Sequence, residues 1–130
     1  MSIEFVISEF LTATPEEIYN AWLSSEAHSQ MTGGAASVSA IVGDEFTAWD
    51  GYIHGKNLEL EYGKRIVQAW RTTEFSADEA DSQIELTLEL MGNQTKITLR
   101  HTGLPAHGGQ YEQGWVEAYF EPMKEYFKKG

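Results

Sequence analysis

Histidine can act as an acid, a base or a metal ligand near neutral pH, and this sequence has four histidines, His28, His54, His101 and His107. Zinc motifs that contain histidine are of two common kinds. In one, histidines and cysteines recur at a set spacing, and in the other a helix carries the pattern His-Glu-x-x-His. No such motif is present, and the chain has no cysteine to complete one or to act as a thiolate nucleophile. We therefore expect neither a metal nor a cofactor.

His101 is the histidine whose position is easiest to place. It continues the alternation of Ile97 and Leu99, so its imidazole is expected to point into the core, where it needs a hydrogen-bond partner. Two interpretations stay open, a satisfied core histidine and a group that contacts a ligand or transfers a proton. If the protein were an enzyme, His101 or His54 would be the candidate general acid or base.

Other signatures of catalysis are missing from the sequence. There is no G-x-S-x-G motif, and the paired glycines Gly33-Gly34 and Gly108-Gly109 lack the context of a phosphate-binding loop. The sequence therefore predicts no catalytic residue and a protein that is not an enzyme.

Aromatic side chains are the remaining candidates for a functional site. If they converge between a sheet and a helix, they can line an apolar pocket, which is the usual character of a small-molecule site. They can equally fill that space and leave no pocket. The residues predicted to line such a cavity are Trp49, Trp70, Leu86, Leu99, His101, Trp115 and Tyr119.

Composition limits the class of protein and its partners. With 130 residues the chain has room for one hydrophobic core, so we expect a single domain over residues 1–130. Twenty acidic and nine basic residues give a formal charge of −11, which argues against nucleic acid and anionic membranes as partners. Two interpretations stay open: the charge only keeps the protein soluble, or it attracts a basic partner. Neither a signal peptide nor a membrane span is expected, which makes the cytoplasm the expected location.

The elements that must position these residues begin with a predicted strand at 3–11. A helix is expected to start next, with Thr14 as the N-cap, Pro15 at the first helical position and Glu17 completing a capping box. A second short helix, capped by Ser24 or Ser25, is predicted to end at Gly33.

The centre of the chain alternates with a period of two, which is typical of strands with one apolar face. We predict a strand through 46–53, further strands around 58–61 and 66–72, and a hairpin in which Ile84, Leu86, Leu88 and Leu90 face inward before Gly92-Asn93 turns the chain into 97–100. An apolar face of that size must be covered by another layer.

The covering layer is predicted to be the segment 111–127, which carries six of the sixteen aromatic residues. Its apolar residues repeat at helical spacing, and Pro122 is expected to kink the helix. The residues predicted to form its apolar face are Trp115, Val116, Tyr119, Phe120, Met123, Tyr126 and Phe127. The predicted fold class is α+β.

Several short motifs in this order resemble one known family, the activators of the heat-shock-protein-ninety ATPase, within the START-like and polyketide-cyclase-like superfamily. The motifs that carry the resemblance are Thr14–Tyr19, Val42–Phe46, Asp50–Gly55, Lys64–Arg71, Gly103–Pro105 and Gln113–Glu121. The resemblance implies a helix-grip fold, with a curved antiparallel sheet of about six to seven strands wrapped on a long C-terminal helix and two short helices after the first strand.

The resemblance also implies a function without chemistry, that of a non-catalytic domain that binds a heat-shock chaperone, with a co-chaperone or stress-response role. In the two-domain eukaryotic members a separate N-terminal domain supplies most of the ATPase stimulation, and only thirteen residues precede Thr14 here. The alternatives are a carrier of a small hydrophobic ligand and, ranked third, a cyclase or hydrolase. A monomer or weak homodimer is expected.

Overall fold

The computed structural model describes residues 3–128 and shows one curved sheet with all helices on one face. Six strands pair antiparallel in the spatial order β1-β6-β5-β4-β3-β2. The strands are β1 (Ile3–Leu11), β2 (Glu45–Ala48), β3 (Ile53–Glu61), β4 (Arg65–Thr72), β5 (Ser82–Met91) and β6 (Gln94–Leu104). The α+β class predicted from the sequence is confirmed.

Two short helices follow β1, as the capping signals predict. Helix α1 (Pro15–Trp22) starts at Thr14, whose hydroxyl accepts from the Glu17 N–H at 3.1 Å, while the Glu17 carboxylate accepts from the Thr14 N–H at 2.8 Å. Helix α2 (Ser25–Thr32) is capped by Ser24 and ends at Gly33, whose φ of 85° is in the left-handed region that glycine tolerates.

The contribution of the capping box to stability can be tested by mutation. Replacing Thr14 by alanine removes an acceptor for a helix N–H, so we expect the free energy of unfolding to fall by about 1 kcal/mol. Urea denaturation followed by tryptophan fluorescence measures it. Thr73→Ala, an exposed threonine after β4, is the control and should change stability by less than roughly 0.5 kcal/mol. Equal stability of the two variants would show that the cap is not stabilising.

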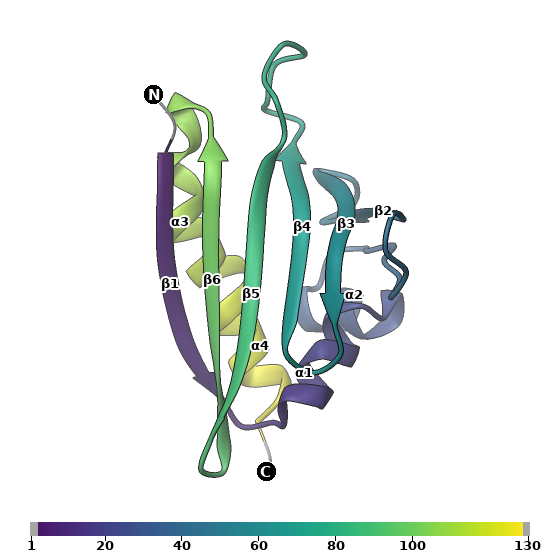
Figure 1. Ribbon diagram of the computed structural model, residues 1–130, viewed down its shortest axis with the longest axis vertical. Coiled ribbons are helices and arrows are strands. Elements are labelled where there is room, and N and C mark those ends of the chain that lie inside the picture. Colours follow the sequence, from purple (N-terminus) through teal and green to yellow (C-terminus); the bar gives the residue numbers. More distant parts are fainter. Residues whose placement is uncertain (1–2, 129–130) are drawn as a thin grey trace.

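The C-terminal helix runs behind β1, β6 and β5, and its far end meets α2 (Figure 1). It consists of α3 (Gln110–Trp115), a π-helical segment (Val116–Phe120) and α4 (Glu121–Tyr126), preceded by a 3-10 turn (Ala106–Gly109). In the wider segment the Glu121 N–H donates to the Val116 carbonyl, five residues back. This π-helical turn lies directly before Pro122, the residue at which the sequence predicts a kink.

The π-helical turn also corrects the predicted apolar face of this helix. Tyr126 is 40% exposed, although its spacing from Tyr119 in a regular helix predicts burial, and Tyr111 is buried instead. One extra residue in a turn rotates the following side chains by about 100°, which moves Tyr126 away from the sheet. Met123 and Phe127 take the buried positions.

Two predictions for the strands are also wrong in detail. The alternation through 46–53 is not one strand, because the chain reverses at Trp49–Tyr52 between β2 and β3. Leu90 has the inward parity of β5 but is 60% exposed, because the β5–β6 hairpin extends beyond the helical layer (Figure 1). The core lies between the sheet and the helices, where Ile84, Leu86, Ile97 and Leu99 are fully buried.

Candidate functional site

An apolar cavity of about 400 Å³ lies between the C-terminal helix and the β2–β4 part of the sheet. Its wall combines the turn after β2, the start of β3, the end of β4 and one face of α3 with the following turn. Six of the nine lining residues are aromatic, and none is charged. The lining residues are Trp49, Tyr52, Ile53, Trp70, Tyr111, Gly114, Trp115, Ala118 and Tyr119.

Four of the seven residues predicted from the sequence line this cavity, namely Trp49, Trp70, Trp115 and Tyr119. The other three, Leu86, Leu99 and His101, are fully buried core residues that do not line it. Sequence reasoning missed five lining residues. Tyr111 precedes Trp115 by one helical turn, and the small residues Gly114 and Ala118 repeat at the same spacing, so both signals were present in the sequence.

The mouth of the cavity is formed by its half-buried lining residues, Trp49, Tyr52, Gly114 and Ala118. Trp49 and Asp50 have positive φ angles of 51° and 59°, a conformation that is uncommon for side chains as large as tryptophan. The turn is held by the Asp50 N–H, which donates to the Ala35 carbonyl, and by the Asp50 carboxylate, which accepts from the Ala35 N–H. These two hydrogen bonds therefore join the turn at the cavity mouth to Ala35, in the segment that follows α2.

A glycine opposite the turn makes this arrangement possible. A Cβ on Gly34 would lie 2.6 Å from Cε3 of Trp49, so only glycine lets the indole approach here. The Trp49 Nε1 is buried without a hydrogen-bond partner among the described residues. An unpaired buried donor costs about 1–3 kcal/mol.

His101 lies next to the cavity wall and holds Trp115 in place. The Trp115 Nε1–H donates to His101 Nδ1 at 3.0 Å. Ser82 Oγ donates to the Trp70 carbonyl and lies 2.8 Å from His101 Nε2, so the neutral imidazole carries its proton on Nε2 and donates it to Ser82. Burial lowers the pKa of His101 to about 3.

These contacts decide between the two interpretations of His101. Both ring nitrogens are engaged inside the protein, and at neutral pH the imidazole is uncharged. His54, the other candidate acid or base, is exposed on β3 and does not line the cavity. Neither histidine is placed to transfer a proton to a molecule in the cavity.

His28 plays a similar part for Tyr119 at the α2 side of the site. Its Nδ1–H donates to the Trp22 carbonyl at 2.8 Å, so Nε2 is the acceptor for the Tyr119 hydroxyl at 2.9 Å. Burial lowers the pKa of His28 and raises the pKa of Tyr119, so both groups are neutral at pH 7. The hydroxyl proton of this lining residue is therefore directed into the protein.

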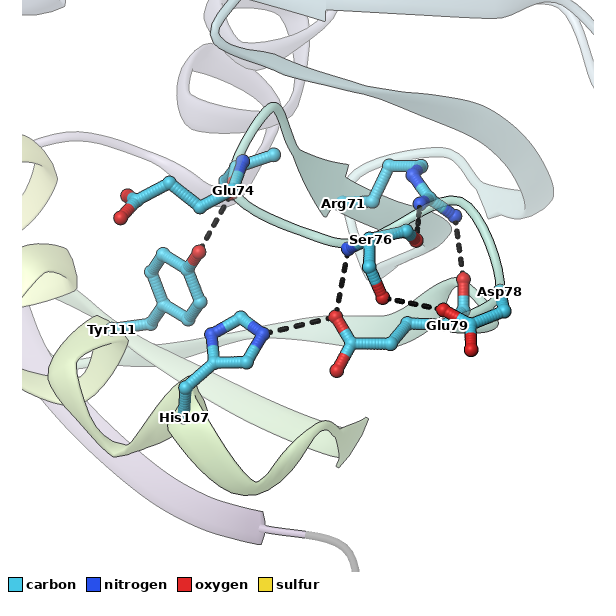
Figure 2. A network of polar contacts seen from close by, with 8 residues as sticks. Arg71, Glu74, Ser76, Asp78, Glu79, His107 and Tyr111 are labelled. Carbon is cyan, nitrogen blue, oxygen red and sulfur yellow. Dashed lines mark hydrogen bonds and ion pairs between the residues drawn. The ribbon is translucent and has the colours of Figure 1, made fainter.

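The opposite end of the cavity carries a small group of oxygen atoms. The Tyr52 hydroxyl donates to the Glu74 carboxylate, and the Tyr111 hydroxyl lies 2.6 Å from Thr72 Oγ1. Burial, and then the hydrogen bond to Glu74, raise the pKa of Tyr52. Figure 2 shows Glu74 beside Tyr111 at the start of the loop that follows β4.

That loop is fixed by further polar contacts (Figure 2). The Arg71 guanidinium donates to the Ser76 and Glu79 carbonyls and pairs with Asp81 at 2.9 Å. Glu79 accepts from the Ser76 N–H and contacts His107 at 3.0 Å, and the contact with His107 is the largest cause of its lowered pKa. Because the loop is held at both ends, Glu74 has a defined place beside the cavity.

Within residues 3–128, no three His, Asp or Glu side chains gather in a way that suits a metal ion. In the same range, no helix has the length and apolar character needed to cross a membrane.

Comparison with known proteins places this geometry in a family. The family model described as "Activator of Hsp90 ATPase homolog 1-like protein" matches residues 12–128. The human protein named activator of 90 kDa heat shock protein ATPase homolog 1 is 28% identical over 128 residues, which is 98% of this chain and 38% of the human protein. The chain thus spans about two fifths of that relative.

Solved structures show the same fold. An HSP90 activator from Plasmodium falciparum superposes with a TM-score of 0.86 at 23% identity, with 95% of each chain covered. A structure described as an Aha1 dimer from Colwellia psychrerythraea gives a TM-score of 0.83 at 17% identity, with 98% of each chain covered. The helix-grip fold expected from the resemblance is confirmed, and the chain belongs to the family of activator of Hsp90 ATPase homolog 1-like proteins.

Proposed function

We propose that this protein is a non-catalytic binding domain whose cavity takes a small apolar ligand. The observation that carries the proposal is the cavity of about 400 Å³ that remains although six large aromatic side chains surround it. Ligand sites of small molecules have volumes of about 300–1,000 Å³ and are lined mainly by apolar and aromatic residues. Sequence reasoning ranked a ligand carrier second, and the open cavity moves it to first place.

The lining argues for binding without turnover. It contains no carboxylate, no amine and no histidine, and the hydroxyl protons of Tyr52 and Tyr119 are directed to Glu74 and His28. A general acid or base must reach its substrate within hydrogen-bond distance, directly or through one water. The cavity offers apolar and aromatic contact area, which suits retention of a ligand.

Filling the cavity from the helix tests the proposal. Gly114 lines the cavity, and a Cβ on this residue would meet no atom within 4 Å, so the side chain of Gly114→Leu has room to extend toward the cavity. Leucine is also a better helix former than glycine by about 0.8 kcal/mol. We expect unchanged or higher thermal stability together with at least tenfold weaker ligand binding.

The measurement is native mass spectrometry of freshly purified protein, followed by fluorescence titration with small apolar compounds such as toluene and indole. Gly109→Ala is the matched control, since its Cβ would also meet no atom within 4 Å and Gly109 does not line the cavity. Equal ligand binding by the Gly114→Leu variant and the unchanged protein would contradict the proposal.

A second candidate function is binding to an Hsp90-type chaperone. It is favoured by the family match and by the human relative, whose printed name is that of an activator of the 90 kDa heat shock protein ATPase. The outer face of β1 offers an apolar contact area, because Val6 and Phe10 are 60% and 44% exposed. The charge of −11 favours a basic partner surface.

The chaperone proposal predicts that the protein co-precipitates with a purified Hsp90-type chaperone and changes its ATPase rate. Val6→Ser and Phe10→Ser should weaken that binding, whereas Gly114→Leu should leave it unchanged, because the cavity lies on the other face of the sheet. No binding at roughly 50 μM, which corresponds to a weak complex, would end this candidate.

A further inference from the structure

We propose that the cavity selects an organic cation, an apolar molecule that carries an amine or a quaternary ammonium group. This inference rests on the proposed ligand-binding function and specifies the chemical class of the ligand. It is drawn from three observations on the described residues: the arrangement of the aromatic rings, the distribution of charge around the cavity, and the direction of the hydroxyl protons.

The aromatic rings form walls that meet at an angle. Trp70 and Tyr111 lie 5.0 Å apart at 79°, and Trp115 lies 5.6 Å from Trp70 and 4.7 Å from Tyr119 at about 40°. With Trp49 and Tyr52 at the mouth, π faces and ring edges surround the space on several sides. The negative face of such a ring attracts a cation within about 6 Å, and the attraction is stronger when the cation is desolvated.

The charges near the cavity favour the same ligand class. No basic residue lines it, and the Glu74 carboxylate is bonded to the lining residue Tyr52. The two basic residues that contact the adjacent loop are both engaged, since Arg71 of β4 pairs with Asp81 and His107 of the 3-10 turn contacts Glu79. The chain as a whole carries −11, so its field attracts cations and repels anions.

Two hydroxyl groups of the lining residues have no proton left for a ligand. Tyr119 donates to His28, and Tyr52 donates to Glu74. The indole N–H of Trp115 is likewise directed away, to His101. An anionic head group needs several donors, and the only buried N–H that the lining side chains leave unpaired among the described residues is that of Trp49, whereas an ammonium group is stabilised by π faces. The lining therefore favours a cation over an anion.

Three probes of nearly the same shape test the inference: benzyltrimethylammonium, its neutral isostere neopentylbenzene, and the anion phenylmethanesulfonate. Binding is measured by tryptophan fluorescence and calorimetry on the full chain. We expect the cation to bind at least about tenfold more tightly than the neutral isostere, and the anion to bind most weakly.

A carboxylate variant separates local recognition from net charge. Glu74→Gln should weaken binding of the cation about threefold and leave the neutral probe unchanged, because Glu74 is exposed and its charge is partly screened. Glu89→Gln, an exposed carboxylate on the outer face of β5, is the matched control and should change neither.

The outcomes distinguish this inference from the function on which it rests. Equal or tighter binding of the neutral or anionic probe overturns cation selectivity and leaves the ligand-binding proposal standing. If none of the three probes, nor toluene or indole, binds to the unchanged protein or to the Glu74→Gln variant, both proposals fall. Cation binding that Gly114→Leu abolishes and Glu74→Gln weakens supports both.

Discussion

Replacing Gly55 by alanine is expected to remove a large share of the free energy of unfolding. Gly55 lies in β3, opposite Phe46 of β2 and Trp70 of β4. A Cβ on this residue would overlap the carbonyl oxygen of Ala69 and lie 2.9 Å from Cε2 of Phe46. One of these atoms belongs to the backbone of a central strand, which cannot move without breaking the hydrogen bonds between β3 and β4.

The expected cost of Gly55→Ala is about 3 kcal/mol or more, the range of severe overpacking. A domain of this size has a free energy of unfolding of about 5–15 kcal/mol, so the loss is a large share of the total. Circular dichroism with urea denaturation measures it. Gly109→Ala is the control, since that residue has helical angles and its Cβ would meet no atom within 4 Å. A Gly55→Ala variant as stable as Gly109→Ala would show that the strands adapt.

Mild acid is expected to destabilise the protein through His101. Its pKa is about 3 in the folded state, against an ordinary value of about 6.5 in the unfolded chain. Below pH 6.5 the His101 side chain is therefore protonated in the unfolded chain but stays neutral in the folded protein. Its contribution to the free energy of unfolding is fully present above pH 6.5 and is lost as the pH falls toward 3. The loss from His101 is about 1.4 kcal/mol at pH 5.5.

His28, whose pKa is also lowered by burial, adds a loss of the same sign in the same direction of pH. The comparison of pH 7.5 with pH 5.5 keeps most carboxylates ionised, which separates the histidine effect from the relief of negative charge at lower pH. Urea denaturation at the two values measures the difference in the free energy of unfolding.

His101→Gln isolates the contribution of one residue. The variant is less stable at both pH values, because the pairing with Trp115 and Ser82 is disturbed, but its difference between them should be smaller by about 1.4 kcal/mol. The imidazole proton resonances of the unchanged protein provide an independent readout, since His101 should not titrate above pH 5. A titration of His101 near pH 6.5 would contradict the buried, uncharged state.

The cavity mouth connects these stability arguments to binding. Trp49 and Asp50 have strained backbone angles, the Trp49 indole N–H is unpaired, and both residues belong to the turn that borders the cavity. Such strain persists only where neighbouring contacts impose it, here from Gly34 and Ala35. Part of the cavity wall is therefore held in an unfavourable conformation by its neighbours.

Local signals in the sequence were enough to predict most of the elements. The Thr14, Pro15 and Glu17 combination marks the start of α1 to the residue, and Ser24 and Gly33 bound α2. Alternation with period two identifies β5 and β6, whose inner residues Ile84, Leu86, Ile97 and Leu99 are fully buried. These features depend on residues a few positions apart, which is why a single sequence contains them.

The sequence alone therefore determined the α+β class, the capped helices, the aromatic C-terminal helix and four of the cavity residues, and its motifs pointed to the family that the comparison confirms. Tertiary structure decided the rest. Whether Trp49, Trp70 and Trp115 fill their space or enclose a cavity depends on the angles between elements far apart in the chain, and so does the pairing of His101 with Ser82. The π-helical turn that exposes Tyr126 is likewise a feature of the tertiary structure. Its one extra residue changes which side chains of the following helix face the sheet. Spacing in a sequence specifies which side chains share a face, but only packing specifies how much room is left between two faces.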